Sequence, residues 1–516
     1  MDRFYNASTD FLDRHLEAGR GAKTAIRTLD RDWSYAEVAE AAERFAGALK
    51  ELGVEIENRV ALLLPDGPEF AIAFFGAIRL GAVPVPLQAT LLPADYARFL
   101  HDSRAKVAVV GAGLADAVRS IRDQLPDLRQ LVVVGDRAPG EESFSDAVTA
   151  AARLGPARTS PDDMAFWLYT SGTSGLPKGI VHLQHDLRFS AQSYGEGVLG
   201  LQSDDVIYSH ARLYFAYGLG NALLYPFWTG AATVLVETPS PEVLVAVLRR
   251  LKPTVYFAVP STFAAALAWV GADFSSVRLC VSSGERLAST IVDEWKQRTG
   301  LEILNALGSS ECCNPFISSR PGDARRDGAG LPVPGYEVRI MDAEGQELPD
   351  GESGELWVKG DSFFAGYWNQ HELTKRTILG EWVRTGDRCL RGSDGYVHHL
   401  GRIDDMLKVG GTWVSPFEIE EVIARHPCVH ECAVVGELDG QLLTRVAAYV
   451  VPRVDCRERA GLERELRRHV RASLPSIKCP RDFHVVAQLP RTASGKIQRH
   501  RLRGPEPVPA APPQRN

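Results

Sequence analysis

Residues 169–179 read Tyr-Thr-Ser-Gly-Thr-Ser-Gly-Leu-Pro-Lys-Gly and are the most informative stretch of this chain. Glycines let backbone N–H groups approach an anion closely, hydroxyls add donors, and Lys178 supplies a cation. No Gly-Lys-Ser/Thr closes the stretch, so it is not a Walker loop. A solvated linker is the alternative for such a composition. The stretch lies between apolar runs at residues 164–168 and 180–181, which favours a phosphate-gripping loop between two strands.

The first three hundred residues alternate helical periodicity with short apolar runs. Apolar side chains recur at helical spacing over residues 35–49, and a second helical pattern runs through residues 70–75. The predicted strands of this region are residues 59–64, 107–110, 130–134, 233–236, 254–257 and 279–281. Strands that alternate with helices form parallel sheets, so the pattern predicts a large α/β body made of parallel-sheet subdomains.

The pattern changes beyond about residue 330, where closely spaced Gly and Pro separate alternating strands at residues 336–340 and 354–359. This predicts a smaller β subdomain. After Gly401 a compact α+β domain is predicted, with helices over residues 417–426 and 462–474 and strands over residues 431–435, 445–452 and 482–486. The expected domains are an N-terminal body (residues 1–400), a hinge (401–406), a small mobile C-terminal domain (407–503) and a disordered proline-rich tail (504–516).

The composition excludes several classes of protein. The chain has 516 residues, of which 45% are hydrophobic and 24% charged, and its net charge is −7 at pH 7. A nucleic-acid binder would have a basic excess, so none is expected. The best candidate for a membrane span, residues 70–87, is interrupted by Arg79 and two prolines. The start carries no signal-peptide core, and eight irregularly spaced cysteines are typical of reduced thiols, so we expect a soluble cytoplasmic protein.

Two groups of cysteines require interpretation. His426, Cys428, His430 and Cys432 alternate as zinc ligands could, but alternation also places side chains on one face of a strand, and an apolar run follows. We favour the strand. The neighbouring Cys312 and Cys313 have no nearby histidine in sequence, so we expect them to line a pocket rather than to act in catalysis.

Further motifs follow the phosphate loop in a fixed order. They are Ala306-Leu-Gly-Ser-Ser-Glu311, Glu352-Ser-Gly-Glu-Leu356, Arg384-Thr-Gly-Asp387, Gly401-Arg-Ile-Asp-Asp-Met-Leu-Lys408 and Arg491-Thr-Ala-Ser-Gly-Lys-Ile497. Together with residues 169–179 they resemble the signatures of the adenylate-forming superfamily, which contains acyl-CoA synthetases, peptide-synthetase adenylation domains and luciferase. The resemblance covers roughly residues 20 to 503.

The resemblance implies a role for each motif. Lys496 is the expected catalytic cation at the α-phosphate, Glu311 the magnesium ligand, Arg402 a ribose or phosphate contact, and Asp404 the hinge pivot. Further residues are expected to bind the nucleotide or, towards the C-terminus, CoA. These are Thr170, Ser171, Gly172, Thr173, Ser174, Gly175, Lys178, Ser283, Gly284, Glu285, Leu307, Gly308, Ser309, Ser310, Asp387, Arg402, Lys408, Gly410 and Gly411.

Residues 215–223 resemble the benzoate-CoA ligase branch of the superfamily. The expected acid pocket is lined by Phe215, Ala216, Tyr217, Gly218, Ser283, Gly284, Leu307, Gly308, Cys313 and Asn314. It contains no Lys or Arg, which disfavours a second carboxylate on the substrate. The chain departs from the wider family at Leu307, where a ring is common, at Ser310, where threonine is common, and at Phe215, where histidine is frequent.

The predicted function is ATP-dependent activation of an aromatic acid, such as benzoate, an aminobenzoate or a hydroxybenzoate, to aryl-AMP, followed by transfer to CoA. ATP, Mg²⁺ and CoA are the implied cofactors, and the protein is expected to be a monomer or homodimer. Two alternatives remain at this stage. One is an aryl adenylation enzyme that loads a carrier-protein thiol, and the other is a non-catalytic homologue that binds nucleotide or a partner.

Overall fold

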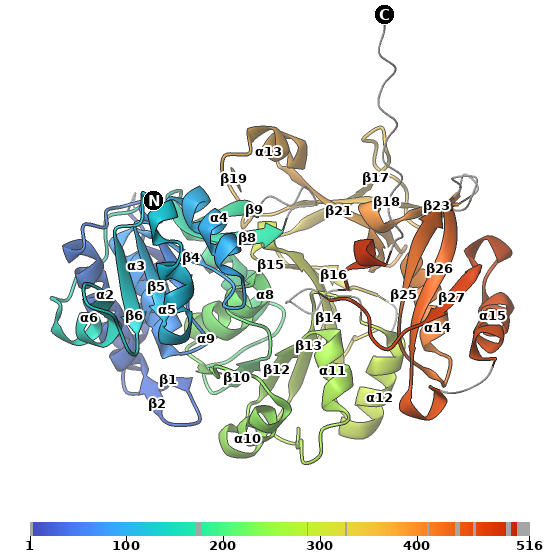
Figure 1. Ribbon diagram of the computed structural model, residues 1–516, viewed down its shortest axis with the longest axis horizontal. Helices are drawn as coiled ribbons and strands as arrows, with labels where there is room; N and C mark the ends of the chain where they lie inside the picture. The colour runs from blue at the N-terminus through green and yellow to red at the C-terminus, as the bar shows by residue number, and fades with distance from the viewer. Residues whose placement is uncertain are drawn as a thin grey trace, which may run out of the picture.

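The computed structural model describes residues 4–171, 177–285, 287–325, 328–409, 412–438, 444–457, 461–491 and 497–502. It consists of a large body and a small C-terminal domain, which lie at opposite ends of the molecule (Figure 1). The predicted α/β class, with parallel sheets in the body and a separate α+β domain, is confirmed. The proline-rich tail, predicted to be disordered, lies outside the described residues.

Two sheets with a parallel interior form the body. The larger has the strand order β16-β15-β14-β13-β12-β10-β11-β1-β2 and is parallel from β14 to β1. Its strands are β1 (Thr24–Arg27), β2 (Asp32–Ser34), β10 (Val206–Ser209), β11 (Ala232–Val234), β12 (Val255–Ala258), β13 (Leu279–Ser282), β14 (Ile303–Ser309), β15 (Asn314–Ser318) and β16 (Leu331–Pro332). The smaller, wholly parallel sheet contains β3 (Arg59–Leu63), β4 (Val83–Pro86), β5 (Val107–Gly111), β6 (Gln130–Val134) and β7 (Glu142–Ser143).

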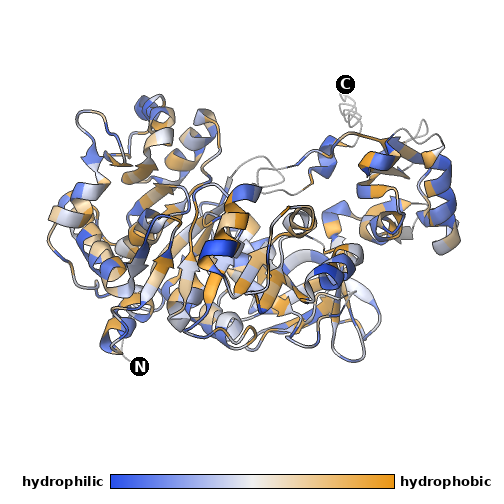
Figure 2. Ribbon diagram, turned by 90° about the horizontal axis from the view of Figure 1, so that it is seen from below, coloured by the Kyte–Doolittle hydropathy of each residue, from blue (hydrophilic) through white to orange (hydrophobic). Residues whose placement is uncertain are grey.

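Helices cover both sheets, and the strand alternation explains the layers. In β3, Val60 and Leu62 belong to the central core, whereas Ala61 and Leu63 face a second cluster on the other side of the sheet. Figure 2 shows hydrophobic residues concentrated on the strands of the body. The helices are α1 (Arg14–Glu17), α2 (Tyr35–Glu51), α3 (Pro68–Leu80), α4 (Pro93–Ser103), α5 (Ala112–Arg119), α6 (Phe144–Ala150), α7 (Gln184–Ser190), α8 (Ala216–Leu219), α9 (Tyr225–Thr229), α10 (Pro241–Leu251), α11 (Pro260–Ala266) and α12 (Ser289–Thr299).

A predicted β subdomain completes the body. Its antiparallel sheet contains β17 (Glu337–Met341), β18 (Ser353–Lys359), β20 (Ile378–Leu379), β21 (Trp382–Arg391) and β22 (Val397–Arg402), with α13 (His371–Thr377) beside it. A separate three-stranded sheet contains β8 (Met164–Ser171), β9 (Pro177–Leu183) and β19 (Gly366–Tyr367). The predicted pair of strands around the glycine-rich loop is therefore confirmed as the hairpin β8–β9.

The small domain has a core of its own, to which Ile419, Val434, Leu466 and Phe483 contribute. The predicted helices and strands of this domain are confirmed, with ends that differ by a few residues. They are α14 (Pro416–Ala424), β25 (Val429–Leu438), β26 (Thr444–Pro452), α15 (Leu462–Ser473) and β27 (Asp482–Val485). Two further strands, β23 (Leu407–Val409) and β24 (Thr412–Val414), were not predicted. The boundary at residues 401–406 and the mobility of the domain stay predictions.

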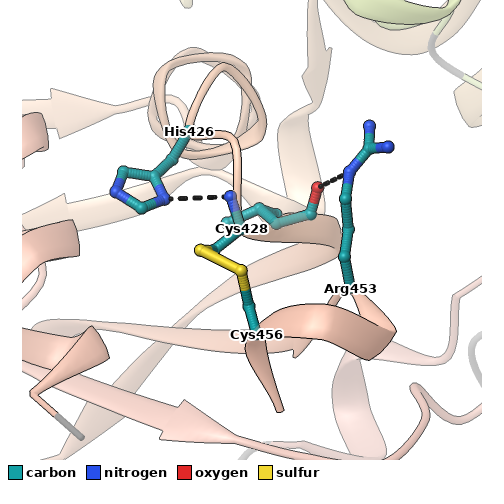
Figure 3. Close-up of a disulfide and its surroundings, with 5 residues drawn as sticks. His426, Cys428, Arg453 and Cys456 are labelled. Carbon is teal, nitrogen blue, oxygen red and sulfur yellow. Dashed lines mark hydrogen bonds between the residues drawn. A yellow bond between two sulfur atoms is a disulfide. The ribbon is translucent and has the colours of Figure 1, made fainter. Parts of the chain in front are cut away.

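The expectation that all cysteines are reduced thiols was wrong. Cys428 and Cys456 form a disulfide with a Cα–Cα distance of 5.5 Å, which joins the start of β25 to the loop after β26 (Figure 3). Arg453 holds the same corner, because its backbone N–H donates to the Cys428 carbonyl at 2.9 Å. The two cysteines are 28 positions apart in the sequence, so an analysis of local spacing could not identify this pair. The strand predicted at Cys432 is confirmed as part of β25.

Candidate active site

The hairpin β8–β9 flanks the glycine-rich stretch of the sequence on both sides. Thr170 lies opposite Lys178 and Ser171 opposite Pro177 in its register. The Lys178 ammonium lies 5.7 Å from the ring centre of Tyr367, a residue of the neighbouring strand β19. The predicted phosphate contacts Gly172, Thr173, Ser174 and Gly175 lie outside the described residues.

Glu311 stands on a short 3₁₀ turn, Ser310–Cys312, directly after β14. The Tyr367 hydroxyl donates to its carboxylate at 2.8 Å, and the Phe364 N–H donates to its backbone carbonyl at 2.8 Å. Burial raises the pKa of Tyr367, and the charge of Glu311 raises it further, so this phenol remains a donor. Tyr367 therefore links the predicted metal ligand to the strand that neighbours Lys178.

Asp387 and Arg402 face each other across β21 and β22. The Asp387 carboxylate lies 3.3 Å from the Arg402 guanidinium and 3.1 Å from Nε2 of His399. Burial acts to raise the pKa of Asp387, but the hydrogen bond and charge of His399 and the charge of Arg402 hold it below its usual value. Asp387 is 6% exposed, so a carboxylate is kept ionised at an almost buried position.

Arg402 connects this pair with Glu311. Partial desolvation lowers the pKa of Arg402, and the negative charges of Asp387, Glu311 and Asp404 raise it above its ordinary value. Its guanidinium also donates to the Thr385 carbonyl at 2.6 Å. Gly386 makes room for this contact, because a Cβ there would lie 2.7 Å from the guanidinium. The structure thus gathers the two carboxylates Glu311 and Asp387 around one arginine.

The predicted nucleotide residues of the body meet at the carboxyl ends of parallel strands. Ser283, which is 5% exposed, and Gly284 directly follow β13, while Leu307 to Ser309 end β14 and Ser310 begins the next turn. Gly284 has a φ of 87°, a left-handed conformation that glycine adopts without strain. Glu285 lies 3.7 Å from Arg491 of the small domain. In open α/β sheets, ligands bind beyond the carboxyl ends of the strands, and the predicted nucleotide-binding residues lie at this edge.

The predicted acid pocket borders the same edge of the sheet. The Tyr217 hydroxyl donates to the Val281 carbonyl at 2.9 Å, which places its ring across the end of β13. Gly218 is required there, because a Cβ would lie 2.0 Å from the Arg212 carbonyl oxygen. Ala216 is half-buried and packs against the central core. The Phe215 ring contacts Tyr214 edge-on, with 4.7 Å between ring centres.

The other side of the predicted pocket is the segment after β14. Cys313 is fully buried, has a φ of 53°, and accepts a hydrogen bond from the Ser190 hydroxyl at its carbonyl. Burial raises the pKa of its thiol well above the ordinary value, which fits a pocket wall rather than a nucleophile. The side chain of Asn314 lies outside the described residues.

Sequence reasoning missed four polar residues at or near this site: Tyr367, His399, His182 and Asn221. The first two bind Glu311 and Asp387, and tertiary structure alone brings them there. His182 follows Lys178 on β9 and bonds the Ser310 carbonyl. Asn221 is 1% exposed on a π-helical turn, Gly220–Leu224, and within the described residues its carboxamide makes no hydrogen bond of normal geometry, although it lies close to the Tyr217 hydroxyl. Its position four residues after Tyr217 was the available signal.

Comparisons with known proteins agree with this arrangement. Residues 12–368 match the family model of the AMP-binding enzyme, and residues 418–496 match that of the AMP-binding enzyme C-terminal domain. The chain belongs to the AMP-binding enzyme family. It is 41% identical to a 4-hydroxybenzoate-CoA/benzoate-CoA ligase of Rhodopseudomonas palustris over 97% of this chain and 94% of that protein.

Solved structures support the same family membership. An anthranilate CoA ligase in complex with anthranoyl-AMP superposes with a TM-score of 0.93 at 39% identity, covering 97% of both chains. A benzoate CoA ligase from Burkholderia xenovorans LB400 superposes with a TM-score of 0.90 at 38% identity, covering 97% of this chain and 100% of that one. The agreement extends over both the body and the small domain of this AMP-binding enzyme.

The residues present fit the ligands of an AMP-binding enzyme. Mg²⁺ prefers oxygen ligands and is commonly held by one or two carboxylates together with substrate phosphates. Glu311 offers such a carboxylate, with Lys178 and Arg402 nearby as cations for phosphate. No cluster of three or more His, Cys, Asp or Glu side chains suited to a metal occurs among the described residues. Asp387 presents a fixed acceptor that suits ribose hydroxyls.

The small domain contributes predicted residues that the structure describes only in part. Asp404 is exposed on the 3₁₀ turn Ile403–Asp405, and Lys408 is exposed on β23. Lys496, Gly410 and Gly411 lie outside the described residues. An isolated bridge joins Arg491 and Ile497, and Arg491 faces Glu285 of the body. The roles of these residues therefore stay predictions.

Proposed function

We propose that this AMP-binding enzyme activates a single-ring aromatic carboxylic acid with ATP to an aryl-AMP and then transfers the aryl group to CoA. The observation that carries the proposal is that Glu311, directly after β14, acts on Arg402, which pairs with Asp387, while the Tyr217 ring lies across the end of the adjacent strand β13. The aromatic-acid CoA ligases that the chain resembles support the choice of acid and acceptor.

The chemistry explains the need for such a site. A carboxylate is a poor acyl donor, so its oxygen first attacks the α-phosphorus of ATP and pyrophosphate leaves. Lys178 is suited to the phosphate charge, Asp387 to the ribose, and the predicted Lys496 to the charge that develops at the α-phosphate. Mg²⁺ held by Glu311 would neutralise phosphate charge. In the second half-reaction a thiolate attacks the acyl carbon and AMP leaves.

The acid is expected to carry one flat ring. A ring that buries about 150 Å² at roughly 25 cal/mol per Å² gains about 4 kcal/mol before entropic costs, an advantage that acetate lacks. The Tyr217 ring is fixed by its bond to Val281, so a long aliphatic chain would have to displace it. None of the predicted lining residues is basic, which disfavours a dicarboxylate.

Asn221 bears on the substituents of the ring. Burial raises the pKa of the nearby Tyr217 hydroxyl, and hydrogen bonding with the Asn221 side chain opposes that effect, so the two side chains lie close together. A buried carboxamide whose hydrogen bonds are incomplete is costly, and a hydroxyl or amino group on a substrate could complete them. We expect hydroxy- or aminobenzoates to be preferred over benzoate by up to about tenfold.

A panel of acids tests the proposal. Values of kcat/KM would be measured for benzoate, 2-aminobenzoate, 4-hydroxybenzoate, acetate and octanoate by AMP release with CoA as the acceptor. An aromatic acid should be the best substrate. Higher values for acetate or octanoate would refute the aryl assignment. Aryl-AMP formation without any thioester in this carrier-free assay would instead favour an enzyme that loads a carrier protein.

A further inference from the structure

A buried histidine lies between the two motifs that handle phosphate and metal. His182 and Asp186 are both fully buried, and Nδ1 of His182 lies 2.8 Å from Oδ2 of Asp186. The other ring nitrogen, Nε2, lies 2.8 Å from the backbone carbonyl of Ser310, which is 128 residues away in sequence. Ser310 immediately precedes Glu311, the predicted metal ligand.

The local structure fixes the orientation of this histidine. Strand β9 ends at Leu183, and Asp186 occupies the first turn of α7, where its Oδ2 accepts from the Leu183 N–H at 3.0 Å. The Phe166 ring, from the paired strand β8, stacks on the imidazole at 4.8 Å with an interplanar angle of 13°. A carboxylate at one edge and a ring on one face leave the imidazole little freedom to rotate.

The hydrogen bonds constrain what the pair can do. A carbonyl oxygen accepts but cannot donate, so Nε2 must carry a proton to bond Ser310. A carboxylate oxygen also accepts, so the contact between Nδ1 and Asp186 needs a second proton, which the imidazole and the carboxylate share. Burying a polar pair of this kind seldom adds net stability compared with apolar residues of similar size. Its presence next to Glu311 therefore calls for another explanation.

We propose that His182 is a positioning residue, which fixes the Ser310–Glu311 peptide so that the Glu311 carboxylate faces the magnesium ion and the phosphates. The inference rests on the proposed function of the site. Glu311 is already held from the other side by the Tyr367 hydroxyl and by the Phe364 N–H. His182 adds the missing constraint, and because β9 also carries Lys178, it couples the position of the lysine strand to that of the carboxylate.

The test measures metal binding, not turnover. Mn²⁺ would be titrated into the whole protein with α,β-methylene-ATP present, and free Mn²⁺ followed by electron paramagnetic resonance. His182→Ala should weaken Mn²⁺ binding at least about tenfold, as is usual when a group that orients a metal ligand is lost. The KM for the aromatic acid should change less than twofold.

His15 offers a matched control. It is fully buried, and its Nε2 contacts the Phe227 carbonyl at 2.5 Å, so it is another buried histidine bonded to a distant carbonyl. His15→Ala should lower the melting temperature but leave Mn²⁺ affinity unchanged. Equal loss of Mn²⁺ affinity in the His15 and His182 variants would overturn the proposal, because general loosening would then explain both.

A rescue variant separates positioning from folding. In His182→Gln/Asp186→Asn the glutamine amide can still donate to Ser310 while its oxygen accepts from the asparagine. This variant should regain most of the Mn²⁺ affinity, and it provides the test if His182→Ala does not fold. Unchanged Mn²⁺ affinity in His182→Ala, or no recovery in the double variant, would refute the role of His182. A wild type that binds Mn²⁺ but forms no aryl-AMP would refute the proposed function alone.

Discussion

The body and the small domain both combine helices with sheets, but they are held together differently. The central core of the body spans both of its sheets, whereas the small domain closes around its own cluster. The described contacts between them include polar ones: Ser289 donates to Glu421, the Ser415 hydroxyl donates to the Leu400 carbonyl at 2.6 Å, and Arg491 faces Glu285. Polar interfaces of this kind permit domain motion.

This difference in packing indicates which part of the site each region can carry. The Asp387–Arg402 ion pair and the nearby Glu311 need a rigid support, and the body supplies it through two paired strands and a short turn. A cavity lined by His399, Phe417 and Glu421, among others, separates the body from α14. A residue such as the predicted Lys496, which is needed at the active site in one half-reaction and must move away in the other, is better carried by the small domain.

The largest expected effect comes from Lys496. Replacing it with Ala should lower aryl-AMP formation by about 100-fold or more, because a charge that stabilises the first transition state is lost. Thioester formation from supplied aryl-AMP should change little. ATP–pyrophosphate exchange and thioester assays measure the two steps. Lys478, which pairs with Glu418 at 2.6 Å inside the small domain, provides the control variant, and equal losses in both steps would contradict the assigned role.

The disulfide should stabilise the small domain and not the body, because both of its cysteines lie in the small domain. Cys428→Ser/Cys456→Ser should destabilise the small domain by about 2–4 kcal/mol, since the bond closes a loop across a separation of 28 residues. Because the small domain carries Lys496, aryl-AMP formation should be lost at the denaturant concentration at which this domain unfolds. Denaturant unfolding of oxidised and reduced wild type checks the effect, with Cys479→Ser, at a free cysteine, as the control. If reduction leaves the unfolding curve unchanged, the disulfide does not stabilise the domain.

A change at the hinge should impair the second half-reaction and spare the first, the reverse of the effect expected for Lys496→Ala. Asp404→Pro fixes φ at the exposed turn Ile403–Asp405 and should slow thioester formation by about tenfold, 1.4 kcal/mol, while aryl-AMP formation survives. Asp404→Ala, which leaves φ free, is the control. Normal rates of both steps in the proline variant would show that residue 404 is not the pivot.

The smallest expected effect concerns acid stability of the body. The pKa of Asp387 is lowered on balance, so its contribution to stability is present above the ordinary value of about 4 and disappears as the pH falls through the lower, folded pKa. Asp387→Asn should therefore differ most from wild type near neutral pH and least in acid. Unfolding free energies from pH 7 to pH 3 measure this, with exposed Asp116→Asn as the control. A constant difference across that range would contradict the linkage.

Much of the fold could be predicted because its signals are local. Short apolar runs marked the strands of the body, helical spacing marked α2, and glycine, hydroxyl and lysine residues between two apolar runs marked the hairpin β8–β9. The ends of strands and helices were less certain, since capping and fraying decide them. The disulfide was missed because its cysteines are distant in sequence, and local spacing contains no information on such pairs.

The sequence by itself determined the order of the motifs, and with it the family and the identities of Glu311, Asp387, Arg402 and Lys496 as candidates. Only the tertiary structure decided their partners. Tyr367 reaches Glu311 from a different sheet, and His182 reaches the Ser310 carbonyl across 128 residues. The physical reason is that chemical type is carried by each residue, whereas hydrogen-bond partners depend on which strands the sheet topology places side by side.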